Sequence, residues 1–168
     1  MTSATSASSG SAIEELIEQF SKASSRKRKT LASDLEKRVD EISKLGLASL
    51  SLFDPAGDDW GAGWILQVVN RHCPKSLVEN FSLKNGSIWF TSPSEVGIDF
   101  DPLQQELLLE NFEEADRLTS STLRKLAGEA AVSRGYIYFT EVESIPGLDL
   151  ITIDRLWKVY SQGKFGFT

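Results

Sequence analysis

Residues 149–160 read DLITIDRLWKVY and carry the clearest helical pattern in the chain. Their apolar side chains recur at the spacing of one helix face: Leu150, Ile153, Leu156, Trp157 and Tyr160. Asp149 or Thr152 is expected to cap the start of this helix, and Gly163 to end it. The pattern predicts a helix with one buried face and favours a mostly α domain.

Two more helices are predicted upstream of this stretch. After Pro102 the apolar residues again share one helix face, at Leu103, Leu107, Leu108 and Phe112. Asn111 is expected to cap the next helix, with Glu114 in the capping-box position three residues on. That helix is expected to continue through Leu123 and Leu126 until Gly128. The C-terminal part of the chain therefore reads as a set of packed helices.

The N-terminal part is predicted to be a helical hairpin spanning residues 12–46. Helical spacing marks a first apolar face at Ile13, Leu16, Ile17 and Phe20, and a second at Leu31, Leu35, Val39, Ile42 and Leu45. Ser11 is the expected N-cap of the first helix, Gly46 the end of the second, and the basic run 26–29 the connection. A coiled-coil or dimer seam is the alternative. Residues 1–11 are Ser/Thr/Ala-rich and are expected to be disordered or a plastid transit remnant.

Residues 47–95 give mixed patterns and match no family by inspection. The stretch 54–59 reads as a turn that leads into a helix over 65–71, and Pro74 suits the first position of a short helix ending near Phe81. Asn85-Gly86 predicts a turn before 87–91, a short β-like run. This stretch is treated as a separate segment between the hairpin and a domain at 96–168.

Composition excludes several classes of function. The 168 residues carry a formal net charge of −6, which argues against unspecific nucleic-acid binding. A single cysteine, Cys73, and a single histidine, His72, complete neither a disulfide nor a zinc site. The basic run Arg26–Lys29 is interpreted as a solvated helix end, with a nuclear address or an anionic-lipid contact as alternatives. No catalytic or metal-binding residues are predicted, because Glu141 and Glu143 have no nucleophile or base beside them in the sequence.

The C-terminal sequence resembles the Genomes Uncoupled four family. The resemblance rests on six words in the family's order: GIDFDPLQ (97–104), NFEEAD (111–116), LAG (126–128), YFTEVE (138–143), DLITIDRLW (149–157) and SQGKFGF (161–167). It covers the chain from Gly97 to its end. The stretch GEAAVSRGY at 128–136 is closer to plant and algal members than to cyanobacterial ones.

The resemblance implies a fold, ligands and a partner. Family members have an α-helical, cupped-hand domain that is often preceded by a helical module. They bind protoporphyrin IX and Mg-protoporphyrin IX as ligands, without a prosthetic group, and stimulate magnesium chelatase through its large porphyrin-binding subunit. They are regulators and not enzymes. Plant and algal members act in the chloroplast, in the stroma and partly on membranes, and are linked to plastid signalling. A cyanobacterial member would be cytoplasmic.

The resemblance also implies the binding residues. They are Phe139, Val142, Ile153, Trp157 and Phe167, with Arg124 and Arg134 as candidates for the propionates. Family members continue past the Phe-Gly-Phe segment with a hydrophobic, Trp-containing loop and an arginine that line the site. The chain is therefore interpreted as the first half of the domain, C-terminally truncated, and its porphyrin affinity is the open question.

Two other readings of the sequence stay open. In the first, the chain is a protein-interaction module that has lost porphyrin binding and docks a partner on Leu31, Leu35 and Ile42. In the second, the basic run 26–29 with Phe20 nearby makes a peripheral membrane contact.

Overall fold

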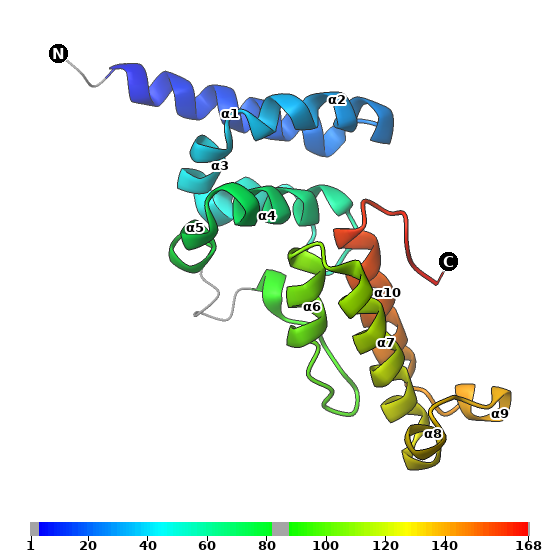
Figure 1. The fold of residues 1–168 in the computed structure, drawn as a ribbon. Helices are drawn as coiled ribbons and strands as arrows, with labels where there is room; N and C mark the ends of the chain where they lie inside the picture. The colour runs from blue at the N-terminus through cyan, green and yellow to red at the C-terminus, as the bar shows by residue number, and fades with distance from the viewer. Residues whose placement is uncertain (1–3, 82–87, 168) are drawn as a thin grey trace.

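The computed structural model describes residues 4–81 and 88–167, and the regular structure in those two ranges is helical throughout (Figure 1). The prediction of a mostly α fold is therefore confirmed. Two 3₁₀ turns, η1 (Gly46–Leu50) and η3 (Ile88–Phe90), accompany the α-helices. The α-helices are α1 (Ala4–Lys22), α2 (Ser25–Glu36), α3 (Val39–Leu45), α4 (Trp60–His72), α5 (Pro74–Glu79), α6 (Asp101–Leu108), α7 (Phe112–Ala127), α8 (Glu129–Arg134), α9 (Phe139–Val142) and α10 (Gly147–Tyr160).

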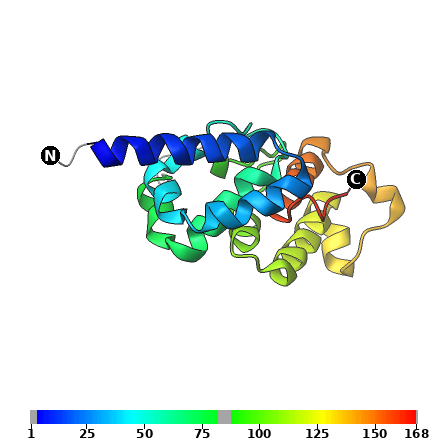
Figure 2. The same ribbon diagram turned by 90° about the horizontal axis from the view of Figure 1, so that it is seen from above.

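Helices α1 and α2 pack against each other as the predicted hairpin, but both begin earlier than expected (Figure 2). Helix α1 starts at Ala4 instead of after Ser11. Residues 4–11 include only two alanines, so the extension follows from continuing a helix whose amphipathic part is anchored in the core, and not from local propensity. Helix α2 starts at Ser25, so the basic run 26–29 lies in its first turns and not in the connection.

The predicted second helix is two helices, α2 and α3, separated at Lys37 and Arg38. The break lets α3 pack against α1, α2, α4 and α5. Leu35 and Ile42 are fully buried in the core of this chain. They are therefore not available as the docking face or dimer seam considered above, because intramolecular packing already covers them.

The interpretation of the basic run as a solvated helix end is wrong for Arg28, which is buried. Its guanidinium forms two hydrogen bonds with the carboxylate of Asp59, at 2.6 and 3.0 Å, and its Nε donates to the carbonyl of Phe20 at 2.8 Å. Its Cζ lies 5.2 Å from the ring centre of Trp60. Phe20 is itself fully buried, so it is not the membrane-facing residue considered above. Arg28 thus joins α1 and α2 to the start of α4.

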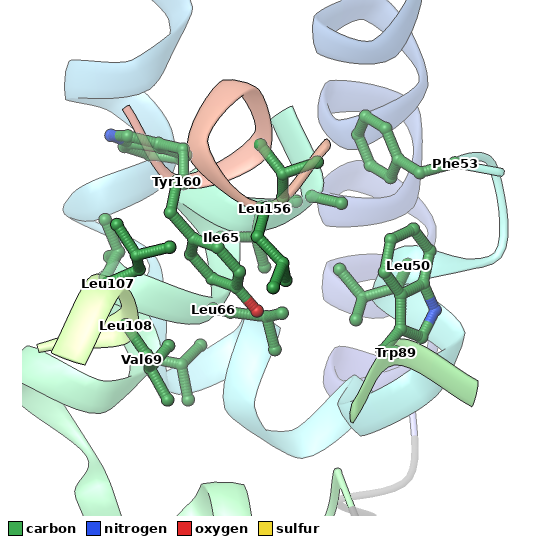
Figure 3. Close-up of a cluster of buried hydrophobic side chains, with 14 of the residues drawn as sticks. Leu50, Phe53, Ile65, Leu66, Val69, Trp89, Leu107, Leu108, Leu156 and Tyr160 are labelled. Atoms are coloured by element: carbon green, nitrogen blue, oxygen red, sulfur yellow. The ribbon is translucent and has the colours of Figure 1, made fainter. Parts of the chain in front are cut away.

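Helix α4 forms the centre of the molecule and packs against α3, α5, α6 and α10. It begins at Trp60, earlier than the predicted helix over 65–71, and its start is capped by the Asp59 carboxylate, which accepts from the Gly61 amide at 2.8 Å. Its residues from Gly61 to Val69 are all buried. Figure 3 shows Ile65, Leu66 and Val69 of this helix among side chains of α6 and α10.

The segment 47–95 is joined to the C-terminal helices through buried polar bonds. The side-chain amide of Gln67 in α4 donates to the carbonyls of Leu107, at 3.0 Å, and Tyr160, at 2.8 Å. Gln104 in α6 donates to the carbonyl of Trp89 at 2.8 Å. Each bond satisfies a buried group that would otherwise be costly, so this segment and the C-terminal helices share one core.

Some local predictions are confirmed and others are wrong. Pro74 begins α5 as predicted, whereas Ile88–Phe90 is a 3₁₀ turn and not part of a strand. The predicted turn at 85–86 lies outside the described residues. Asn111 is the N-cap of α7 but makes no side-chain cap bond, and its amide nitrogen donates to the Glu106 carboxylate at 2.8 Å. Helix α10 begins at Gly147, since Asp149 is already engaged by Ser94 and the Glu95 amide.

Candidate functional site

The structure places the five predicted binding residues in three different environments. Phe139 and Val142 lie on the short helix α9, where they are 87% and 47% exposed. Trp157 and Phe167 line a groove at the C-terminal end of α10. Ile153 is fully buried in the core between these two regions. The structure therefore brings together Phe139 with Val142 and Trp157 with Phe167, but it does not place all five residues in a single pocket.

The first of these regions is an exposed apolar surface on α8, α9 and their connection. We call it the α8–α9 surface and define it by Val132, Arg134, Tyr136, Tyr138, Phe139 and Val142. Its five apolar or aromatic members are all at least 47% exposed. In Figure 1, α8 and α9 lie at the far end of the molecule from the N-terminal hairpin. So much exposed apolar surface in a short segment is typical of a binding surface.

Arg134 holds this surface together. Its guanidinium donates to the Glu141 carboxylate at 2.5 Å and lies 4.1 Å from the ring centre of Tyr138. Glu141 also accepts from the Tyr138 amide at 2.9 Å and so caps α9. The hydrogen bond from Arg134 is the main cause of the lowered pKa of Glu141, followed by the bond from the Tyr138 amide. The Nε of Arg134 is buried and has no hydrogen-bond partner within the part of the chain described.

The second region is a groove lined by four aromatic side chains, which we call the aromatic groove. Phe112, Trp157 and Phe165 stand with ring centres 6.0 to 6.1 Å apart. Trp157 is stacked on Phe112, while Phe165 meets Trp157 edge-on at 90°. Phe167 completes the lining, and the groove has a volume of about 420 Å³, within the usual range for ligand sites.

The aromatic groove is held open by hydrogen bonds around its edge. The Trp157 indole N–H donates to Thr119 on α7 at 2.9 Å. The Phe167 amide donates to Asp154 at 2.6 Å, which ties the C-terminal segment back to α10. Asp154 also pairs with Lys158 at 2.8 Å, and its hydrogen bond is the main cause of the raised pKa of Lys158. These bonds fix the walls without using the faces of the rings.

Sequence reasoning missed two residues of the aromatic groove, Phe112 and Phe165. Phe112 was assigned to an apolar helix face, although its position at the first residue of α7 leaves it half-buried. Phe165 stands in the same Phe-Gly-Phe segment as Phe167, which was the available clue. Arg124, one candidate for the propionates, lines a polar hollow along α7 with Arg117 and not the α8–α9 surface.

The described residues hold neither a metal-site cluster nor a membrane-spanning helix. In residues 4–81 and 88–167, no group of three or more His, Cys, Asp or Glu side chains is arranged to hold a metal ion. Over the same ranges, no helix has the length and apolar character needed to cross a membrane.

Comparison with known proteins identifies the segment that contains both surfaces. Residues 93–168 match the family model described as GUN4-like. This segment is GUN4-like. The resemblance to the Genomes Uncoupled four family, seen in the sequence words from Gly97 onward, is thereby confirmed.

Curated relatives align with less than two thirds of this chain. A Ycf53-like protein of Synechocystis is 49% identical over 79 residues, which are 47% of this chain and 34% of that protein. The chloroplastic tetrapyrrole-binding protein of Arabidopsis thaliana is 45% identical over 74 residues, which are 44% and 28%. An uncharacterized ycf53 protein of Porphyra purpurea is 40% identical over 103 residues, which are 61% and 38%. The match spans about a third of the length of these relatives.

Proposed function

We propose that this chain binds a porphyrin on the α8–α9 surface of its GUN4-like segment. The supporting observation is the combination, on one short segment, of exposed aromatic and aliphatic side chains with Arg134. A further support is the 45% identity over 74 residues to a relative from Arabidopsis thaliana that is named as a tetrapyrrole-binding protein. Protoporphyrin IX and Mg-protoporphyrin IX are the proposed ligands.

The chemistry of a porphyrin favours the α8–α9 surface over the aromatic groove. A porphyrin has a broad apolar face and two propionates at one edge, so its site needs apolar side chains and a cation near the rim. Arg134 supplies such a cation. The aromatic groove is instead bordered by Glu113, Asp116 and Asp154, which would repel the propionates.

The predicted residues take different parts in this proposal. Phe139 and Val142 contact the macrocycle, and Arg134 receives a propionate. Ile153 supports α10 from the core and does not contact the ligand. Trp157 and Phe167 lie in the aromatic groove, so they contribute only if a larger ligand-bound assembly brings the two regions together.

The proposed role in the cell is regulatory and not catalytic. In this proposal the porphyrin-bound chain stimulates magnesium chelatase by contacting its large subunit, in chlorophyll biosynthesis, with a further part in plastid signalling. Matches to a chloroplastic protein and to a cyanobacterial one support either the chloroplast or the cyanobacterial cytoplasm as its location.

Titration of the 168-residue chain with deuteroporphyrin and its magnesium complex, followed by quenching of tryptophan emission, tests the proposal. We expect saturable binding that weakens roughly tenfold in Phe139→Ala, since burying a phenylalanine side chain contributes about 1.5–3 kcal/mol. Phe139 is 87% exposed, so the substitution should leave folding intact. Leu52→Ala, at a half-exposed residue outside the GUN4-like segment, is the matched control.

Two results would contradict the proposal in different ways. Equal affinity of Phe139→Ala and the unaltered chain would show that the porphyrin lies elsewhere. No saturable binding by a folded sample would favour the alternative, an interaction module that has lost porphyrin binding. The docking face of that module would then be sought on the α8–α9 surface, since Leu35 and Ile42 are buried.

A further inference from the structure

The aromatic groove has a composition that the proposed porphyrin site does not explain. Three ring systems, Phe112, Trp157 and Phe165, meet around one opening. The indole N–H of Trp157 is already satisfied by Thr119 and one face of the ring is stacked on Phe112, so the indole offers its remaining apolar ring surface to the groove. Aromatic faces carry partial negative charge and attract cations that lie over them.

Two carboxylates reinforce this preference at the rim. Glu113 and Asp116 stand on the first two turns of α7, are exposed, and border the aromatic groove. Within residues 4–81 and 88–167, neither carboxylate takes part in a hydrogen bond or ion pair. Arg117, the nearest arginine in sequence, is held by Glu114 at 2.5 Å. Glu113 also suits the N-terminal end of the helix dipole, but Asp116 lies a turn further on and gains less from it.

No lysine or arginine lines the aromatic groove among the residues described. Lys158 stands beside it but pairs with Asp154 at 2.8 Å. The groove therefore combines aromatic walls, an acidic rim and no lining cation. This combination disfavours an anion, because the rim carboxylates would repel it. It also disfavours a purely apolar ligand, because such a ligand would bury the rim carboxylates without compensation.

We propose that the aromatic groove binds a compact organic ammonium ion, with the charged group over Trp157 and Phe165 and its counter-charge supplied by Glu113 and Asp116. Alkylated ammonium groups suit such a site because they are weakly hydrated and present an apolar surface to the rings. The volume of about 420 Å³ admits a small molecule of this class. This site is separate from the α8–α9 surface, so the proposal can be tested independently of porphyrin binding.

The test uses choline as the probe and the full chain labelled with 5-fluorotryptophan. Fluorine NMR resolves the four tryptophans individually, and Trp157→Phe assigns the resonance in the groove. We expect choline to shift the Trp157 resonance saturably. The neutral isostere 3,3-dimethylbutan-1-ol should bind about fivefold more weakly or worse, because it lacks the charge.

Substitutions at the rim of the aromatic groove test whether choline binding depends on the charge of the carboxylates or on the shape of the groove. The double variant Glu113→Gln, Asp116→Asn keeps the size of both side chains and should weaken choline binding at least about fivefold. Phe165→Leu, at a half-exposed ring, should also weaken it. Glu129→Gln, an exposed acid in the first turn of α8, is the matched control and should bind choline normally.

Three results would overturn the proposal. They are equal binding of the neutral alcohol, unchanged affinity in the rim double variant, and no response of the Trp157 resonance up to the highest usable choline concentration. Circular dichroism of each variant confirms that the helices are retained, so a loss of binding is not mistaken for a loss of fold.

Discussion

At the scale of single residues, the ionisation of Tyr160 affects the stability of the fold. It is almost wholly buried, and its hydroxyl accepts a hydrogen bond from Gln104 at 3.0 Å. Burial raises its pKa to about 12, partly offset by the bond from Gln104 and by Arg155. The folded chain therefore holds this proton more tightly than the unfolded chain does.

This difference predicts a loss of stability at alkaline pH. Because the folded pKa lies above the unfolded value near 10, the contribution is complete below pH 10 and is lost as the pH rises toward 12. A shift of two units corresponds to about 3 kcal/mol. Tyr160→Phe should show a smaller fall in the free energy of unfolding between pH 9 and about 11.5, measured by urea denaturation. An equal fall in both proteins would mean that Tyr160 ionises as easily folded as unfolded.

The predicted binding residues show what spacing can and cannot reveal at this scale. Ile153 and Trp157 are one helical turn apart, and their shared face was predicted correctly. Yet Ile153 is fully buried beneath neighbouring helices, while Trp157 reaches the surface. Periodicity predicts which face of a helix packs against the rest of the protein. It does not predict how many turns of that face are buried, because this depends on Phe112 and Phe165, which come from other segments.

At the scale of helices, the contact between α4 and α10 depends on Gly63. A Cβ at this position would lie 2.3 Å from the carbonyl oxygen of Val159 in α10, which is far inside contact distance. The absence of a side chain lets the two helices approach closely and brings Gln67 within reach of the Tyr160 carbonyl.

We therefore expect Gly63→Ala to destabilise the protein despite the higher helix propensity of alanine. Overpacking of this kind costs about 1–3 kcal/mol, more than the roughly 0.5–1 kcal/mol that alanine gains over glycine in a helix. Gly147→Ala is the control, since a Cβ on this first residue of α10 would meet nothing within 4 Å. The urea midpoints of the two variants give the comparison. A stabilised Gly63→Ala would show that α10 can move away without cost.

Helices with a long apolar stripe were predicted from sequence, whereas the short helices α8 and α9 were not. α1, α4, α7 and α10 each repeat their apolar face over several turns, so their own residues define them. The separation of α2 from α3 has no Pro or Gly to mark it, because it arises from packing of α3 on α4. Likewise α9 spans only Phe139–Val142, and it is fixed by the bonds of Glu141 to Tyr138 and Arg134.

At the scale of the whole molecule, the N-terminal hairpin and the GUN4-like segment share a continuous core. Buried side chains extend from Ile13 and Phe20 through α4 to Leu156 and Tyr160. The sequence suggested three segments with separate boundaries, because composition changes along the chain but does not report which segments pack together. The contacts of α4, with the bonds from Gln104 to Trp89 and from the Glu95 amide to Asp149, reveal that the middle segment joins the other two.

A shared core predicts that distant parts of the chain unfold together. Phe20 packs against Trp64 with ring centres 5.3 Å apart, and neither side chain lines the aromatic groove that contains Trp157. Phe20→Leu keeps an apolar side chain but loses these ring contacts, and we expect a cost of about 1–2 kcal/mol. With 5-fluorotryptophan labels, the urea midpoints of Trp64 and Trp157 should coincide and should fall by the same amount in the variant. If only the Trp64 midpoint moved, the hairpin with α4 would be a separate folding unit, and the binding surfaces of the GUN4-like segment would be stable without it.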